Sequence, residues 1–204
     1  HAAAGQRPQR HAGAIATTSM VVSKTGDDAF EEILDFVRDI CNDPDLYLDQ
    51  IIYHSEKRTG NLDRSLAYYM ESKNMMLGDV VTSLDTYFKQ CSMMVTARSL
   101  ANLGAVLANG GVKPWDNKRI IPDEEARCIK SLMMTTGLYN QSGTYSRLIG
   151  VPTKSGVGGG LMSAAPHKYG IGIFSPALDK DGNSIAGLDL LRDIVDGLEL
   201  DIFD

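Results

Sequence analysis

The residues best suited to chemistry lie in one short segment, Lys154-Ser155-Gly156-Val157-Gly158-Gly159-Gly160. The segment combines a cation and a hydroxyl with four glycines. Glycine lets backbone N–H groups approach a ligand closely, because no Cβ stands in the way. N–H groups aimed at a developing oxyanion stabilise acyl transfer, and a lysine with a serine can orient a substrate carboxylate. The segment therefore indicates an oxyanion site, and a glycine-rich hairpin that merely turns the chain is the alternative.

Three other side chains have types suited to a small polar ligand. Glu56 lies in a polar stretch, where it is either a solvated carboxylate or a group that grips a ligand ammonium. Tyr87 falls on the apolar side of a predicted helix, so filling the core is its alternative role. Tyr139 follows a predicted helix and lies on a loop, two residues after Gly137. Loops on a rigid scaffold often carry functional residues.

The sequence contains no recognisable activated serine nucleophile. A Ser-x-x-Lys pair needs a serine one helical turn before a lysine, so that the lysine takes the proton of the hydroxyl, and no serine in this chain has that spacing. There is also no Gly-x-Ser-x-Gly motif. The chain by itself therefore offers binding and oxyanion groups without a nucleophile.

Composition narrows the class of protein. The chain has 204 residues, 43% hydrophobic and 23% charged, which suits one domain or one large part of a two-lobed domain. The net charge of −6 argues against nucleic acid or an anionic membrane as a partner, since both bind through Lys and Arg. No apolar run approaches the roughly 18 residues of a membrane-spanning helix.

Cysteine and histidine spacing gives no support to a metal site. The three cysteines form no CxxC pair, and the four histidines form no i, i+4 pair. We expect no metal and no cofactor. Unpaired cysteines suit a reducing compartment, so we expect a cytoplasmic location. The residues concerned are Cys41, Cys91 and Cys128, and His1, His11, His54 and His167.

Hydrophobic periodicity predicts a helical cluster followed by a small sheet. Helices are predicted over residues 27–41, 63–73, 79–91, 96–109, 122–135 and 184–200. Residues 12–22 fit either a strand or a buried helix turn, and residues 46–53 are predicted to be extended. Residues 161–165 and 169–175 read as two strands of a hairpin, which the last helix would cover. The predicted class is α+β, with a helical cluster and an antiparallel sheet.

Taken in order, several short motifs of the sequence resemble those of the serine-dependent glutaminases, which share the fold of β-lactamases and penicillin-binding proteins. The resemblance covers roughly residues 12–195. The matching motifs include Ala12-Gly13-Ala14-Ile15, Ser55-Glu56 with Thr59-Gly60, Tyr87-Phe88, Leu107-Ala108-Asn109-Gly110-Gly111, Gly137-Leu138-Tyr139 and the segment Lys154 to Gly160.

The resemblance implies hydrolysis of L-glutamine to L-glutamate and ammonia through an acyl-serine intermediate. It implies that Glu56 binds the substrate α-amino group and that Tyr87 and Asp63 contact the substrate. It also implies that Tyr139 assists proton transfer beside the nucleophile, and that the Val157 N–H completes the oxyanion hole. A zwitterionic amide needs one anion, a few donors and an oxyanion hole, so the residue types fit this chemistry.

The sequence departs from the family pattern in three places. The family's Ser-x-x-Lys pair lies upstream of the Ala-Gly-Ala-Ile motif. We therefore expect a fold that is incomplete at its N-terminus, and a chain that is inactive alone. The family has asparagines just before that motif and seven residues after the glutamate, where this chain has His11 and Asp63. A second acid at Asp63 should weaken binding of a substrate carboxylate, unless it is protonated or turned away.

We expect a leader or tail over residues 1–11 and a glutaminase-like domain over 12–204. That domain would have a mainly helical lobe, 12–150, and a sheet hairpin with a covering helix, 151–204. L-glutamine is the expected partner, and we expect a homo-oligomer. The main alternative is a non-catalytic relative that binds an amino acid. A relative acting on another amide or a β-lactam also stays open.

Overall fold

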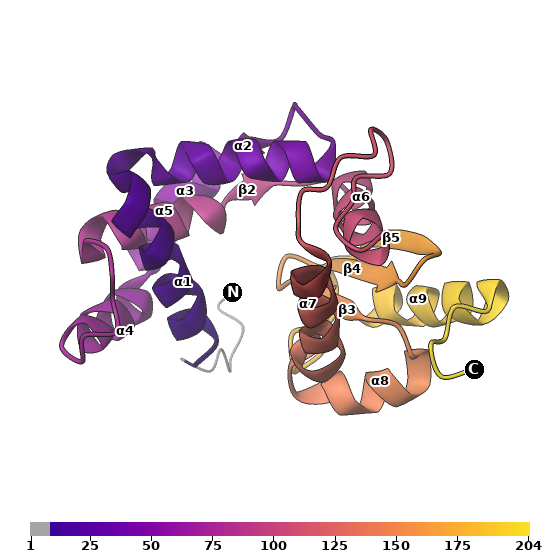
Figure 1. The fold of residues 1–204 in the computed structure, drawn as a ribbon. Coiled ribbons are helices and arrows are strands. Elements are labelled where there is room, and N and C mark those ends of the chain that lie inside the picture. The colour runs from indigo at the N-terminus through magenta and orange to yellow at the C-terminus, as the bar shows by residue number, and fades with distance from the viewer. Residues whose placement is uncertain (1–8) are drawn as a thin grey trace. The chain divides into compact units, whose positions relative to one another are not determined.

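The computed structural model describes residues 9–204. They form two compact units, each described by itself below. The first unit comprises the residues up to 39 together with 44–95, and the second comprises 40–43 together with 96–204. The predicted α+β class is confirmed, because many helices accompany two small antiparallel sheets (Figure 1).

The first unit is mostly helical. Its core lies between α1, α4 and α5, where the buried side chains include Ile15, Ala67 and Phe88. A two-residue antiparallel pair joins β1 to β2, with Leu48 opposite Met93. The elements are α1 (Gln9–Thr25), η1 (Gly26–Asp28), α2 (Ala29–Cys41), β1 (Tyr47–Leu48), α3 (Gln50–Thr59), α4 (Asn61–Glu71), α5 (Val80–Gln90) and β2 (Met93–Met94).

Two uncertain stretches of the first unit prove helical. Residues 12–22, for which strand and helix both stayed open, lie inside α1. The prediction that residues 46–53 are extended is wrong for residues 50–53, which belong to α3. The carboxylate of Asp49 accepts hydrogen bonds from the N–H groups of Ile51 and Ile52, at 2.8 and 2.9 Å. This N-cap starts α3, so only Tyr47–Leu48 remain a strand.

The second unit contains a three-stranded antiparallel sheet in the order β3-β4-β5. Its elements are α6 (Ala97–Ala108), α7 (Asp123–Thr136), η2 (Tyr139–Gln141), α8 (Ser142–Ile149), β3 (Thr153–Ser155), β4 (Gly160–Ala165), β5 (Tyr169–Phe174) and α9 (Ile185–Leu198). The predicted hairpin and final helix are confirmed. Sequence periodicity did not predict α8, which ends at Gly150 in a left-handed conformation.

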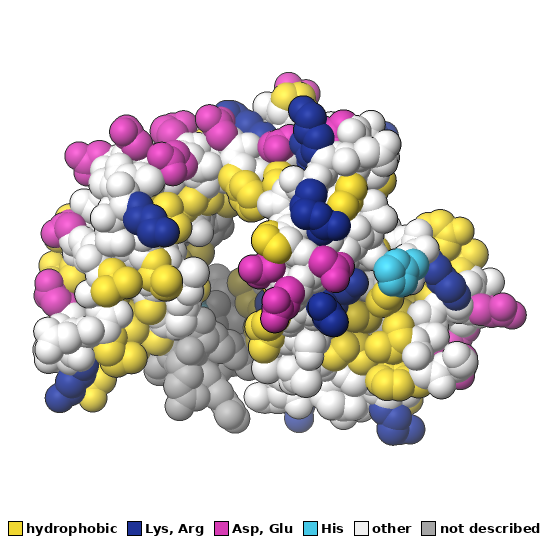
Figure 2. All heavy atoms as spheres, in the orientation of Figure 1, with side chains coloured by type: hydrophobic (Ala, Val, Ile, Leu, Met, Phe, Trp, Pro, Cys, Tyr) yellow, Lys and Arg dark blue, Asp and Glu magenta, His cyan; other side chains and the backbone are white. Residues whose placement is uncertain are grey.

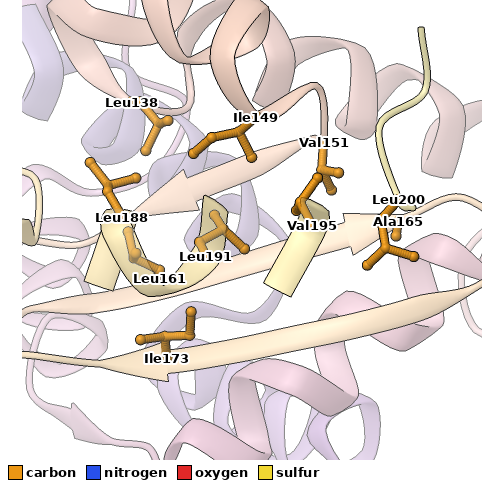
Figure 3. Close-up of a cluster of buried hydrophobic side chains, with 10 residues drawn as sticks. All are labelled: Leu138, Ile149, Val151, Leu161, Ala165, Ile173, Leu188, Leu191, Val195 and Leu200. Atoms are coloured by element: carbon orange, nitrogen blue, oxygen red, sulfur yellow. The ribbon is translucent and has the colours of Figure 1, made fainter. Parts of the chain in front are cut away.

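Successive residues of β5 face opposite sides of the sheet, so they pack against two different layers. A Cβ at Gly170 or Gly172 would collide with the backbone of α6 around Ala101, so these glycines let helix and strand touch. The intervening Ile171 and Ile173 point to the opposite face. There they meet a cluster that α9 covers, as Figure 3 shows. The buried members are Leu138, Ile149, Val151, Leu161, Ala165, Ile173, Leu188, Leu191, Val195 and Leu200.

Acidic side chains gather over η1 and α2 in the view of Figure 2, where Asp27, Asp28, Glu31, Glu32 and Asp35 are exposed.

Among residues 9–204, no helix has the length and apolar character that spanning a membrane requires.

Candidate functional site

Glu56, Asp63 and Tyr87 all belong to the first unit, on three different helices. Glu56 lies in the last turns of α3 and is partly buried. Asp63 lies in the first turn of α4 and is only 7% exposed. Tyr87 is 9% exposed on α5. Gly60 separates α3 from α4, and a Cβ there would collide with the Phe88 ring.

His11 links Asp63 and Tyr87 within the first unit. Its Nδ1 atom lies 2.8 Å from Asp63 Oδ1 and 3.0 Å from the Tyr87 hydroxyl oxygen. The sequence identified His11 only as a departure from the family pattern and not as a site residue. Asp63 was the other departure from the family pattern, and the structure brings His11 and Asp63 into contact.

Tyr87 keeps its proton in this surrounding. Burial raises the pKa of its hydroxyl, and the nearby thiol of Cys91 and carboxylates of Asp63 and Glu56 raise it further. The phenol is therefore a neutral hydrogen-bonding group at physiological pH. Because both carboxylates raise the pKa of this one hydroxyl, Glu56 and Asp63 both lie near Tyr87.

Tyr139 is held in the second unit by an unusual backbone conformation. Its φ angle is 55°, which is uncommon for a residue other than glycine. Lys154 Nζ lies over the ring at 4.6 Å from its centroid. The hydroxyl donates to the carbonyl oxygen of Ser155 at 3.3 Å, and Lys154 Nζ donates to the same oxygen. Strained conformations of this kind persist where surrounding contacts hold them.

Hydrogen bonds from a neighbouring loop supply those contacts. Ser155 Oγ donates to Asn183 Oδ1 at 2.7 Å, and Asn183 Nδ2 donates to the carbonyl oxygen of Leu138 at 3.2 Å. Asn183 is fully buried. Asp181 Oδ2 accepts from Gln141 Nε2 at 3.0 Å. The sequence assigned Asp181-Gly182-Asn183 only to a turn, because a side chain that bonds a distant carbonyl leaves no periodic signal.

Val157 lies in the turn between β3 and β4 rather than in a strand. Gly156 N–H donates to Gly160 O, and Gly159 N–H donates to Gly156 O, both at 2.9 Å. None of the backbone hydrogen bonds found for residues 9–204 outside helices and strands uses the Val157 N–H. Val157 is 52% exposed. The turn therefore leaves this N–H accessible.

Gly182 brings Tyr139 and Val157 to a common neighbour in the second unit. A Cβ at Gly182 would lie 3.5 Å from the Tyr139 ring and 3.7 Å from the Val157 side chain. The candidate residues thus form two sets, one in each unit. Within the described part of the chain, no group of three His, Cys, Asp or Glu side chains is placed to hold a metal ion.

Comparisons with known proteins give these residues a context. The glutaminase family profile matches residues 4–203. The chain is 55% identical to Glutaminase 1 and 47% identical to Glutaminase 2 of Clostridium perfringens, in each case over 96% of this chain and 64% of the relative. The chain therefore spans less than two thirds of the length of these two relatives.

The fold is similar to that of solved glutaminases. A covalent complex of the Bacillus subtilis glutaminase YbgJ with 5-oxo-L-norleucine superposes with a TM-score of 0.89 at 35% identity, over 95% of this chain and 68% of that chain. The structure of the probable glutaminase YbaS gives a TM-score of 0.90 at 35% identity, over 95% of this chain and 62% of that chain. With a profile match along nearly its whole length and these relatives, the chain belongs to the glutaminase family.

Proposed function

We propose that this protein hydrolyses L-glutamine to L-glutamate and ammonia. The observation that carries the proposal is the family membership, joined to 55% identity with a Clostridium perfringens glutaminase. Relatives at such identity commonly share their chemistry, but fold alone does not assign roles to individual residues, so these roles are part of the proposal.

The first unit supplies the groups for the amino-acid end of glutamine. In our proposal Glu56 binds the α-ammonium group, and Tyr87 and Asp63 contact the substrate beside it. A partly buried carboxylate is a strong acceptor for an ammonium, since charge-assisted hydrogen bonds are roughly twice as strong as neutral ones. Among the described residues Glu56 has no ion-pair partner of its own.

Val157 and Tyr139 are the groups that we propose for the amide that reacts. In our proposal the accessible Val157 N–H donates to the oxyanion that forms when the amide carbon is attacked. The Tyr139 hydroxyl assists transfer of the proton to the leaving ammonia. The support for both roles is the fixed turn at residues 156–160 and the constrained backbone of Tyr139.

The nucleophile is the one part of the mechanism for which these 204 residues offer no candidate, because no serine precedes a lysine by three positions. The Bacillus subtilis glutaminase YbgJ forms a covalent complex by reaction with 6-diazo-5-oxo-L-norleucine. An acyl-serine intermediate is accordingly part of our proposal. We expect the 204 residues alone to bind L-glutamine without hydrolysing it.

The second candidate function is binding of an amino acid without catalysis. It is favoured by the same missing Ser-x-x-Lys pair and by the acid at Asp63. A homo-oligomer and a cytoplasmic location also remain proposals. The three free cysteines are compatible with a reducing compartment.

The decisive experiment measures ammonia release from L-glutamine by the protein as its natural source makes it. Hydrolysis is expected, together with loss of at least tenfold in kcat/KM for Tyr139→Phe. Calorimetry that shows binding of L-glutamine without hydrolysis would favour the second candidate. Absence of both binding and hydrolysis would overturn the proposal. Separately, robust hydrolysis by the 204 residues alone would contradict the expected role of a Ser-x-x-Lys nucleophile.

A further inference from the structure

The contact between His11 and Asp63 carries an inference about charge in the first unit. Asp63 Oδ1 is buried and accepts no hydrogen bond from any other residue between 9 and 204. Its contact with His11 Nδ1, at 2.8 Å, is one of charge and short distance rather than of an aligned hydrogen bond. A buried carboxylate is unfavourable without a compensating charge, so the nearest basic group matters to this unit.

The distances decide where the proton of the ring lies. A bare lone pair on Nδ1 would face the lone pairs of Asp63 Oδ1 at 2.8 Å, which is repulsive. An N–H at Nδ1 avoids this repulsion, and it also has the Tyr87 oxygen within hydrogen-bond distance at 3.0 Å. Tyr87 stays protonated, and its own hydrogen can go either to the Cys91 sulfur, a hydrogen bond that helps to raise the pKa of Tyr87, or to a ligand.

Asp63 lies in the first turn of α4, at the positive end of the helix dipole. His11 lies near the start of α1, where the dipole disfavours a positive charge, so the carboxylate itself must supply the compensation. Among the side chains that the structure describes, the charged and titratable groups near the ring include Asp63 on α4, Tyr87 and Cys91 on α5, and Glu56 on α3.

We propose that His11 is the imidazolium counter-ion of Asp63 and positions the Tyr87 hydroxyl as a hydrogen-bond donor. Glu56 is then the single uncompensated carboxylate of this cluster, and it selects a ligand that carries one ammonium group. The ion pair as a whole carries no net charge, so Glu56 sets the charge that a zwitterionic amino acid meets. Only the ligand step, in which Glu56 selects a ligand with one ammonium group, rests on the proposed function. The ion pair is inferred from the geometry of the first unit alone.

The ion pair is tested without any ligand by NMR titration of the histidine rings in the protein and in Asp63→Asn. We expect the His11 ring to be charged at pH 7 and its pKa to fall by about one unit or more in Asp63→Asn, as expected on losing an opposite charge within 4–6 Å. The exposed ring of His54 serves as the internal control, and His11→Asn assigns the signal. A neutral His11 at pH 7, or a pKa unmoved by Asp63→Asn, would overturn the proposal.

The ligand step is tested by calorimetry with L-glutamine. We expect His11→Asn to weaken binding at least tenfold, because Asp63 then opposes the substrate carboxylate. We expect the double variant His11→Asn with Asp63→Asn to restore binding to within about threefold, which a merely structural role for His11 would not produce. Equal weakening in the single and double variants would overturn the ligand step. A wild-type protein that binds no glutamine would overturn the proposed function, while the titration would still decide the ion pair.

Discussion

The two units hold their candidate residues by different physical means. In the first unit, polar side chains from separate helices contact one another directly, as His11, Asp63 and Tyr87 do. In the second unit, the backbone sets the geometry, through the left-handed Tyr139 and the glycine turn around Val157. The first arrangement suits recognition of a charged amino acid, and the second suits donation of an N–H at a fixed point.

This difference predicts different sensitivities. Changes of charge and pH should affect the first unit most, because its contacts are electrostatic. Changes of packing and backbone freedom should affect the second unit most, because its turn and Tyr139 rest on the cluster beneath α9. Three substitutions test this contrast.

The largest effect is expected for Leu191→Ala. Leu191 is fully buried in the cluster between the sheet and α9, so its truncation leaves a cavity. We expect the free energy of unfolding to fall by about 2–5 kcal/mol, with little dependence on pH. Urea denaturation at several pH values measures this. The neighbouring Leu190, 49% exposed, gives the control Leu190→Ala, and similar losses for both would contradict the assigned core.

Gly159→Ala should have the next largest effect. Gly159 has φ of 94°, and a Cβ there would lie 2.5 Å from the Ser175 carbonyl oxygen. Strain and collision together should destabilise the protein by about 2 kcal/mol. Gly158→Ala, in the same turn and with open space around its Cβ, should change thermal stability by less than about 0.5 kcal/mol. Equal effects at both glycines would show that the turn does not depend on the conformation of Gly159.

The third prediction concerns pH in the first unit. Burial raises the pKa of Asp85, but hydrogen bonds from Lys57, Tyr53 and Lys89 outweigh it and lower the pKa to about 2. A carboxyl with a lowered pKa stabilises the fold above its unfolded pKa of about 3.9, and this stability is lost as pH falls towards 2.

Asp85→Asn should therefore cost about 1–2 kcal/mol at pH 7, and the gap from wild type should close between about pH 4 and pH 2. Denaturation curves across this range measure the gap. The exposed Asp35, paired only with Arg38 at 3.2 Å, gives the control Asp35→Asn with an expected change below about 1 kcal/mol. A stability difference between wild type and Asp85→Asn that stays constant with pH would contradict the electrostatic role assigned to the contacts of the first unit.

Local signals in the sequence predicted much of the fold. Asp79 and Thr96 begin α5 and α6 as caps, accepting from Thr82 N–H at 2.8 Å and Ser99 N–H at 3.1 Å. Residues 46–53 misled, because β-branched Ile51 and Ile52 favour strands, whereas the Asp49 cap starts a helix there. The eight-residue α8 is too short for its periodicity to stand out.

The site was only partly predictable. Tyr139 and Val157 followed from the resemblance, but Asn183 and the His11 contact depend on long-range packing that no spacing reveals. His11 and Asp63 were each visible as departures from the family pattern, and the fold shows that their side chains lie 2.8 Å apart.

The central claim is that Glu56 binds the ammonium group of L-glutamine, and calorimetry with wild type and Glu56→Gln tests it most directly. We expect wild type to bind and Glu56→Gln to bind at least tenfold more weakly, a loss of about 1.4 kcal/mol or more. The exposed Glu71 on α4 gives the matched control Glu71→Gln, which should bind as wild type does. Unchanged affinity in Glu56→Gln would contradict the account.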